Sequence, residues 1–268
     1  MRASDEVGEP VDGTGLRHTA PRVRAPLADV GGASYPRGME IVLVPGLWLT
    51  ASSWDTVADD LTRSGHRPRA LTLPGVGIAA SGSAHFGIAD WIADVTRVID
   101  QGDEPVVIVG HSGGGNVVWG AADARPERVA RVILVDTFAP TDGAGIWEFA
   151  VVDGVVPFPG WASFDEVEIA DLDVDARRRA DDEMLSVPAR IPTDPISLHD
   201  DRRHGIPVTV VTCTLSADDL RATLAGSPPW AAEMNAIDDL EIVELPGGHW
   251  PQFAQPHALA SAIDAAIR

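Results

Sequence analysis

The chain has 268 residues, of which 45% are hydrophobic, and its formal net charge is -20 at pH 7. This length and apolar content are enough for one catalytic domain with a sizeable core and an insertion. The negative charge repels nucleic-acid phosphates and anionic lipid headgroups, so it argues against a nucleic-acid or membrane partner and favours a small neutral or apolar ligand.

Residues 1–38 show no apolar periodicity and are rich in glycine, proline, arginine and acidic residues. They predict a disordered or flexible N-terminal extension, and Met39 is a candidate native start. The extension lacks the apolar core of a signal peptide, and no segment approaches the length of a membrane span, so a cytoplasmic location is expected. Cys213 is the only cysteine, which excludes an internal disulfide and a cysteine-rich metal cluster.

From residue 39 onwards, short apolar runs alternate with segments of helical periodicity. The expected strands are 40–44, 69–73, 106–109, 129–135, 207–213 and 240–245. The expected helices are 52–61, 86–99, 116–124, a helix that opens at Ser216, and a final helix over about 255–267. Ser52 and Asp55 form a candidate capping box for the first helix. The alternation predicts an α/β fold with a mostly parallel, doubly wound sheet that helices cover on both faces.

The alternation stops between residues 137 and 205. This stretch holds Trp147, Phe149, Phe158 and Trp161 among prolines and acidic runs. It is too long for an ordinary connection between a strand and a helix. It therefore predicts a helical lid inserted into a core made of residues 39–136 and 206–268.

The most informative motif is Gly110-His111-Ser112-Gly113-Gly114, which follows an apolar strand and precedes a helical segment. This context is typical of a nucleophile elbow, in which a tight strand-to-helix turn exposes the serine hydroxyl. Small residues two before and two after the serine let neighbouring backbones approach without a Cβ clash. Ser112 is therefore the candidate nucleophile, and the amide of Gly113 is a candidate donor to a developing oxyanion.

With this elbow, the segments Val42-Leu43-Val44-Pro45-Gly46 and Leu245-Pro246-Gly247-Gly248-His249 make the chain resemble the α/β-hydrolase superfamily over residues 39–268. Within it the chain looks most like serine esterases whose lid lies between the sixth and seventh strands. The resemblance implies that His249, in the loop after the last strand, is the general base. It also implies that the Leu47 amide completes the oxyanion hole. For the other histidines, a surface or packing role is expected.

The superfamily's sixth and seventh strands correspond here to the expected strands 129–135 and 207–213. The resemblance leaves the acid of the catalytic triad open, because the loop after strand 207–213 holds Ser216 where many superfamily members have a carboxylate. Asp136 ends the strand 129–135, at the carboxyl edge where doubly wound sheets place their sites. Asp218 and Asp219 lie in the first turn of a helix, where capping and the helix dipole explain acidic residues. Asp136 is the preferred acid, and Asp218 and Asp219 remain alternatives.

The expected function is hydrolysis of a small, hydrophobic carboxylic ester or lactone through an acyl-enzyme, with no cofactor and no metal. The aromatic residues expected around the pocket mouth are Trp48, Trp147, Phe149, Phe158, Trp161 and Trp250. A hydroxynitrile lyase or a perhydrolase on the same fold is an alternative, although the chain contains no lysine of the kind that such lyases recruit. A non-catalytic ligand-binding protein is the third possibility. The sequence does not define the oligomeric state.

Overall fold

The computed structural model describes residues 38–268, so the predicted N-terminal extension lies, apart from Gly38, outside the described residues. The centre of the fold is a six-stranded sheet with the order β2-β1-β3-β4-β7-β8. Every neighbouring pair in this sheet is parallel. The strands are β1 (Glu40–Val44), β2 (Arg67–Ala70), β3 (Val106–His111), β4 (Val129–Val135), β7 (Val208–Thr212) and β8 (Leu240–Glu244). The predicted doubly wound α/β architecture is confirmed.

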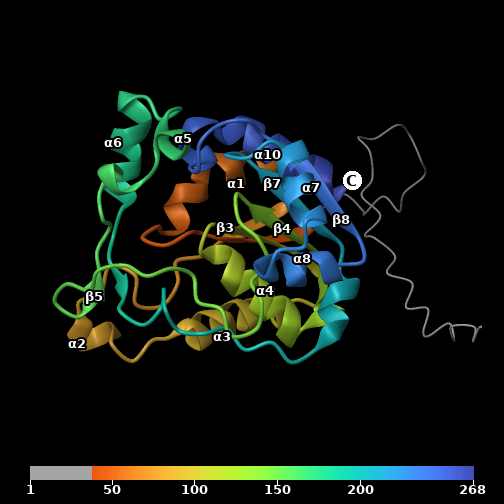
Figure 1. Ribbon diagram of the computed structural model, residues 1–268, viewed down its shortest axis with the longest axis horizontal. Helices are drawn as coiled ribbons and strands as arrows, with labels where there is room; N and C mark the ends of the chain where they lie inside the picture. The colour runs from red at the N-terminus through yellow and green to blue at the C-terminus, as the bar shows by residue number, and fades with distance from the viewer. Residues whose placement is uncertain (1–37) are drawn as a thin grey trace, which may run out of the picture.

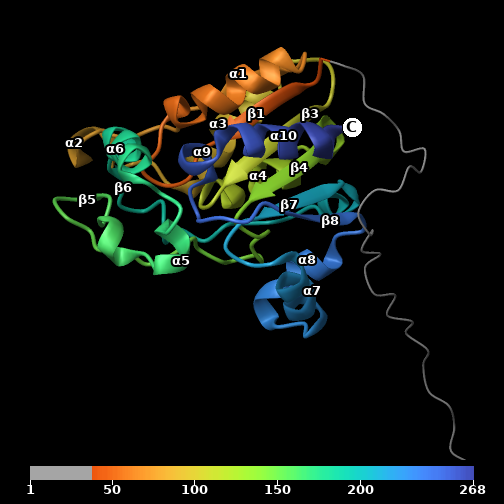
Figure 2. The same ribbon diagram turned by 90° about the horizontal axis from the view of Figure 1, so that it is seen from above.

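Helices cover both faces of the sheet (Figure 1). One face packs against α1 (Asp55–Arg63) and α10 (Pro256–Ile267). The other face packs against α3 (Ile88–Ile99) and α4 (Gly114–Ala124). In Figure 1 the two layers lie above and below the sheet, and Figure 2 looks onto the layer of α1 and α10. The other helical elements outside residues 137–205 are η1 (Ala51–Trp54), α2 (Ala80–Ser83), η2 (Pro126–Arg128), α7 (Ala217–Ala225), η5 (Pro229–Ala231), α8 (Ala232–Ala236) and α9 (Pro251–Ala254).

The central strands are buried on both faces, which explains their continuous apolar sequences. In β1, Ile41 and Leu43 face α1 and α10, whereas Val42 and Val44 face the layer of α3 and α4. All six residues of β3 are buried. Because all the strands of the sheet are parallel, the carboxyl ends of β1, β3, β4 and β8 lie at the same edge.

The predicted capping box of Ser52 and Asp55 is wrong. The turn η1 precedes α1, and the N-cap residue of α1 is Trp54, which makes no side-chain capping bond. The Ser52 hydroxyl instead donates a hydrogen bond to Glu183, which is distant in the sequence. The Ser52 hydroxyl therefore bonds to a carboxylate of the insertion and not, as the local sequence predicts, to the first turn of the helix.

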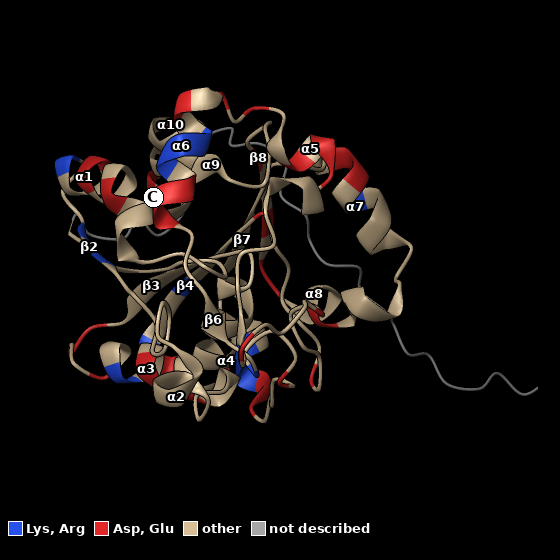
Figure 3. Cartoon of the chain, turned by 90° about the vertical axis from the view of Figure 1, so that its left-hand side faces the viewer, with Lys and Arg blue, Asp and Glu red and all other residues tan. Residues whose placement is uncertain are grey.

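Residues 137–205 lie between β4 and β7 and contain only short elements. These are β5 (Val155–Val156), η3 (Trp161–Ser163), α5 (Glu166–Ile169), α6 (Val174–Glu183), β6 (Val187–Pro188) and η4 (Asp201–Gly205). The strands β5 and β6 form a separate antiparallel pair. Figure 3 looks at this end of the molecule and shows the acidic residues of α5 and the arginines of α6. Among the described residues, no helix is long and apolar enough to cross a bilayer.

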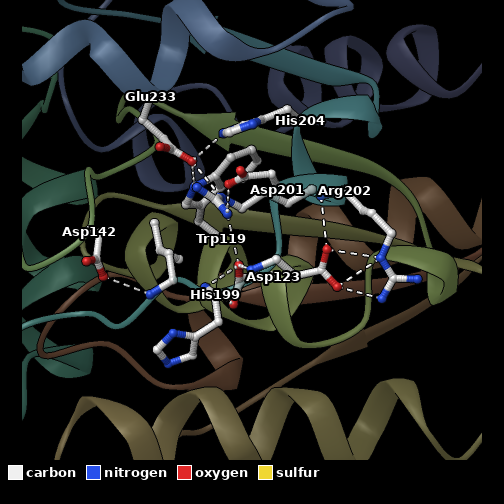
Figure 4. A network of polar contacts seen from close by, with 11 residues as sticks. Trp119, Asp123, Asp142, His199, Asp201, Arg202, His204 and Glu233 are labelled. Carbon is white, nitrogen blue, oxygen red and sulfur yellow. Dashed lines mark hydrogen bonds and ion pairs between the residues drawn. The ribbon is translucent and has the colours of Figure 1, made fainter.

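A buried polar network fixes the last part of the insertion to the core (Figure 4). Arg203 of η4 donates to Glu233 of α8 at 2.6 Å and to Asp123 of α4 at 3.1 Å. Trp119 and His204 also hydrogen-bond to Glu233. Buried charges are stable only when they are paired and hydrogen-bonded, and each of these is. The end of the insertion is therefore held against α4 and α8.

Candidate active site

Ser112 lies on the sharp turn between β3 and α4, with a backbone φ of 50°. Its amide donates to the carbonyl of Val135 on the neighbouring strand at 3.2 Å. A Cβ on Gly110 would lie 2.6 Å from the Gly114 carbonyl oxygen, and one on Gly114 would lie 2.5 Å from the Pro45 carbonyl oxygen. Only glycine fits at these two positions. The strained serine and its glycine neighbours form the elbow that the sequence predicts.

His249 lies in the loop after β8, and its side chain is 14% exposed. Its Nδ1 is 2.7 Å from Oδ2 of Asp136. Asp136 directly follows β4 and has a φ of 46°. The two residues are 113 positions apart in the sequence, and the parallel sheet brings them together because both follow strands that end at the same edge. Asp136 is thus the carboxylate that pairs with the imidazole.

The Asp136 carboxylate accepts hydrogen bonds from four groups. Besides His249, the amides of Cys213 and Thr214 donate at 2.9 and 3.0 Å, and the Thr214 hydroxyl donates at 3.1 Å. Burial raises the pKa of Asp136, but the hydrogen bonds and charge of His249 and the two backbone amides outweigh it, so that the pKa lies below its ordinary value. The carboxylate is therefore ionised at neutral pH, as an orienting partner of an imidazole must be.

The two alternative acids lie in different surroundings. The Asp218 side chain is 96% exposed and pairs with Arg221 at 3.0 Å. Asp219 accepts a hydrogen bond from the Ser216 hydroxyl, while its own amide donates to that hydroxyl at 3.1 Å. Both residues stabilise the first turn of α7 and make no hydrogen bond to His249 in the described structure.

Sequence reasoning missed Thr214. This residue follows β7, in the loop where many superfamily members carry the acid, and here the loop supplies three donors to the acid of the neighbouring strand. Its position directly after a buried strand was the one available signal. A hydroxyl-bearing residue in that place has many structural uses, so the signal alone could not identify the role.

The loop after β1 lies against the elbow. A Cβ on Gly113 would lie 3.0 Å from Cγ of Leu47, and one on Gly46 would lie 3.1 Å from Cβ of Ser112. Within the described part of the chain, neither the Leu47 amide nor the Gly113 amide donates to a protein acceptor. These two backbone N–H groups, one from each of the loops that meet beside Ser112, are therefore free to bind a ligand oxygen.

His111 links the elbow to the loop of His249. Its Nε2 donates to the His249 carbonyl oxygen at 2.7 Å, and the two rings are 5.0 Å apart. Complete burial, and then the neighbouring His249, lower the pKa of His111 to about 3, so its ring is neutral. In this conformation no hydrogen bond joins Ser112 Oγ to His249, and Nε2 of His249 has no partner among the described residues. Catalytic hydrogen bonds of this kind often tighten only when substrate binds.

Residues 41–262 match the Alpha/beta hydrolase family. The chain belongs to this family. Lipase LipV of Mycobacterium tuberculosis is 38% identical to it over 99 residues, which are 33% of this chain and 37% of the lipase. The carbendazim hydrolyzing esterase of a Nocardioides species is 34% identical over 104 residues, which are 38% of this chain and 43% of the esterase. The matches thus span less than half of each of these relatives.

The fold is also shared with solved structures. An extracellular α/β-hydrolase from a Paenibacillus species superposes with a TM-score of 0.68 and is 19% identical, over 85% of this chain and 98% of that one. At this identity the likeness concerns the fold alone. The resemblance inferred from the three sequence motifs is confirmed at the level of family and fold.

In this α/β-hydrolase, aromatic side chains gather next to His249. The Trp250 ring is 5.3 Å from the His249 ring and packs edge-to-face with it. Trp48 packs against Phe149 at 4.9 Å and against Phe158 at 5.5 Å. The aromatic cluster is Trp48, Phe149, Phe158, Trp161, Phe164 and Trp250. Phe164 was not expected in it, and Trp147, which was expected, is 71% exposed.

Two further observations on the described residues concern metal binding and the one cysteine. Among the described residues, no group of three or more His, Cys, Asp or Glu side chains could hold a metal ion. Burial raises the pKa of the Cys213 thiol, with smaller contributions from the charges of Asp136 and Asp171. A thiol in this state is a poor nucleophile.

Proposed function

We propose that this protein is a serine hydrolase that cleaves a small, hydrophobic carboxylic ester or lactone through an acyl-enzyme. The observation that carries the proposal is the 2.7 Å hydrogen bond between His249 Nδ1 and Asp136 Oδ2. The loop of His249 is also joined to the nucleophile elbow, because His111 donates a hydrogen bond to the His249 carbonyl oxygen. The bond to Asp136 fixes the tautomer in which Nδ1 carries the proton and Nε2 is free to accept one. Ser112, His249 and Asp136 are the proposed catalytic triad.

In the first half of the reaction, Ser112 Oγ attacks the carbonyl carbon of the ester while His249 Nε2 takes the hydroxyl proton. The tetrahedral intermediate then collapses, the bond to the leaving oxygen breaks, and His249 returns the proton to the departing alcohol. In the second half, water attacks the acyl-enzyme with His249 as base, and the carboxylic acid is released with Ser112 restored. The ionised Asp136 stabilises the imidazolium in both halves.

The Leu47 and Gly113 amides are the proposed oxyanion hole. Both are backbone donors without an acceptor among residues 38–268, and they lie on the two loops that meet beside Ser112. Donors that are fixed before the reaction stabilise the negative oxygen without reorganisation. Removal of one such donor in other acyl-transfer enzymes lowers the rate by about a hundred- to a thousandfold.

The hydrophobic substrate class is supported by the aromatic cluster beside His249, because aromatic side chains bind apolar groups at a small entropy cost. The relatives are consistent with ester hydrolysis, since one is a lipase and another is an esterase that hydrolyses carbendazim. We place the reaction class at ester hydrolysis and extend it to lactones, in which the leaving alcohol stays attached to the acyl group.

The test compares the parent protein with Ser112→Ala and with Ser64→Ala, which alters an exposed serine distant from the elbow. We expect a pre-steady-state burst with a nitrophenyl ester in the parent and in Ser64→Ala, and its loss in Ser112→Ala. A fluorophosphonate should modify Ser112, as peptide mapping by mass spectrometry would show. Undiminished turnover in Ser112→Ala would refute the serine mechanism. Tight ligand binding without labelling would indicate a binding protein, and release of cyanide or formation of peracid would indicate one of the other enzyme classes.

A further inference from the structure

The loop that carries His249 is held by the insertion as well as by the core. The Gly248 amide donates to Oδ2 of Asp171 at 2.7 Å, and the His249 amide donates to the carbonyl oxygen of Glu168 at 2.8 Å. Glu168 belongs to α5, and Asp171 lies in the turn between α5 and α6. Two consecutive backbone donors next to the imidazole therefore find their acceptors in residues 168–171.

The glycine pair before His249 makes this contact possible. A Cβ on Gly247 would lie 2.6 Å from Oδ2 of Asp171. A Cβ on Gly248 would overlap both the Asp171 carboxylate and the Glu168 carbonyl oxygen. Glycine at position 248 is therefore explained by the close approach of the insertion backbone, whereas Gly247 is crowded by the Gln255 and Asp171 side chains. Backbone torsion does not require glycine at either position, because neither residue has a positive φ.

The helical pair that carries Asp171 is itself anchored at its other end. Glu183, the last residue of α6, accepts a hydrogen bond from the Thr50 hydroxyl at 2.9 Å and another from Ser52. The Leu185 amide donates to the Trp48 carbonyl oxygen at 2.8 Å. Because α5 and α6 are tied to the loop after β1 as well as to the loop after β8, Asp171 is presented to Gly248 from a fixed support.

The Asp171 carboxylate has no counter-ion among the described residues, and its one hydrogen-bond donor there is the Gly248 amide. A carboxylate that receives a backbone N–H makes a charge-assisted hydrogen bond, which is about twice as strong as a neutral one. On the far side of His249, its carbonyl oxygen is held by His111. The backbone on both sides of the imidazole is thus restrained, by the insertion before it and by the elbow after it.

We propose that Asp171 is a positioning residue that, by holding the Gly248 amide, keeps the His249 ring directed at Asp136. The role in turnover rests on the proposed function, whereas the effect on the His249 ring does not. Loss of the Asp171 carboxylate releases the loop of residues 247–249, and the Nδ1 hydrogen bond to Asp136 is then populated only part of the time. Asparagine keeps an acceptor oxygen at this position and preserves most of the effect.

The experiment compares Asp171→Ala, Asp171→Asn and the matched control Asp173→Ala in the full chain. Asp173 is an acceptor of the same kind two residues away, but it caps α6 through the Ala176 amide at 2.7 Å and does not touch the loop of His249. The first readout is the downfield proton resonance of His249 Nδ1–H in NMR spectra, assigned by its disappearance in His249→Gln. The second is kcat and KM for a nitrophenyl ester.

We expect the resonance to broaden or vanish in Asp171→Ala and to persist in Asp173→Ala and Asp171→Asn. We expect kcat to fall about tenfold in Asp171→Ala, with KM nearly unchanged, because the lost hydrogen bond is of the charged class. A resonance in Asp171→Ala as sharp as in the parent overturns the positioning role, whatever the activity. If Ser112→Ala hydrolyses the ester as fast as the parent, the proposed function fails instead, and the resonance still decides the role of Asp171.

Discussion

Three residues around the candidate site have backbone conformations that side chains disfavour. Trp48, Ser112 and Asp136 have φ values of 69°, 50° and 46°. Each such residue costs about 1–3 kcal/mol and persists only where the surroundings enforce it. Here each lies in the loop that directly follows a central strand, β1, β3 or β4. Three of the five described non-glycine residues with positive φ thus lie where the loop after β1, the proposed nucleophile and the proposed acid meet.

The role of Asp136 gives a direct test at this scale. Asp136→Asn should lower kcat by about 10³- to 10⁴-fold, because an amide no longer enforces the tautomer or stabilises the imidazolium. Asp218→Asn, at an exposed position that pairs only with Arg221, should leave kcat within about twofold of the parent. Steady-state kinetics with a nitrophenyl ester measure both. Equal activity of Asp136→Asn and the parent would remove Asp136 from the triad.

The same residues show how far sequence reasoning reaches. Ser112 and Asp136 could be proposed because each follows a strand with a recognisable apolar pattern, and His249 because it lies in a motif typical of the superfamily. Asp171 could not, since its contact with Gly248 joins positions 77 residues apart in the sequence and its own surroundings have no periodicity. A contact of this kind depends on how the insertion packs, which no local pattern encodes.

At the scale of elements, burial decides which segments were predictable. The strand predicted over residues 40–44 and the one over 129–135 coincide with β1 and β4, because most of their residues are buried and apolar, which leaves a run that is recognisable in the sequence. The insertion was recognised only as a break in that pattern. Its helices are short and much of their surface is exposed, so few positions in them are constrained to be apolar. Whether it acts as a lid stays a prediction.

The elbow depends on close packing between two elements, β3 and α4. Gly110→Ala would place a Cβ 2.6 Å from the Gly114 carbonyl oxygen and 2.6 Å from Cγ2 of Val118. Since one of these contacts is backbone, the helix must shift, and we expect a loss of about 1–3 kcal/mol in the free energy of unfolding together with reduced turnover. Gly205→Ala is the control, because its added Cβ meets nothing within 4 Å. Urea unfolding of both variants tests the difference, and equal stabilities would contradict the packing argument.

At the scale of the whole molecule, the formal net charge is -20, and few of the ionisable residues that the structure describes are buried. Asp136 is stabilised as an anion, and His111 as a neutral ring. An ionised acid and an uncharged neighbouring ring fit the proposal that His249 is the general base. The charge state of the folded core thereby supports the proposed chemistry.

The neutral state of His111 also links pH to global stability. Its pKa is about 3 in the folded protein against 6.5 for the free side chain, so the unfolded chain binds the proton first as the pH falls. Protonation of the unfolded state then favours unfolding, and the folded protein loses about 1.4 kcal/mol per pH unit from this residue between roughly pH 6 and pH 4. Above about pH 7 the contribution is fully present, because the ring is neutral in both states.

His111→Gln removes this titration and keeps a side-chain donor near the His249 carbonyl oxygen. The free energy of unfolding, measured by urea titration at pH 7, 6, 5 and 4, should therefore fall more steeply in the parent than in the variant, by about one proton's worth of slope. The other groups that face this ring, His249 and Asp136, are present in both proteins and cancel in the comparison. Parallel curves for the two proteins would mean that His111 takes up a proton in the folded state as readily as in the unfolded chain. The hydrogen bond to the His249 carbonyl oxygen would then be made by a charged ring at low pH.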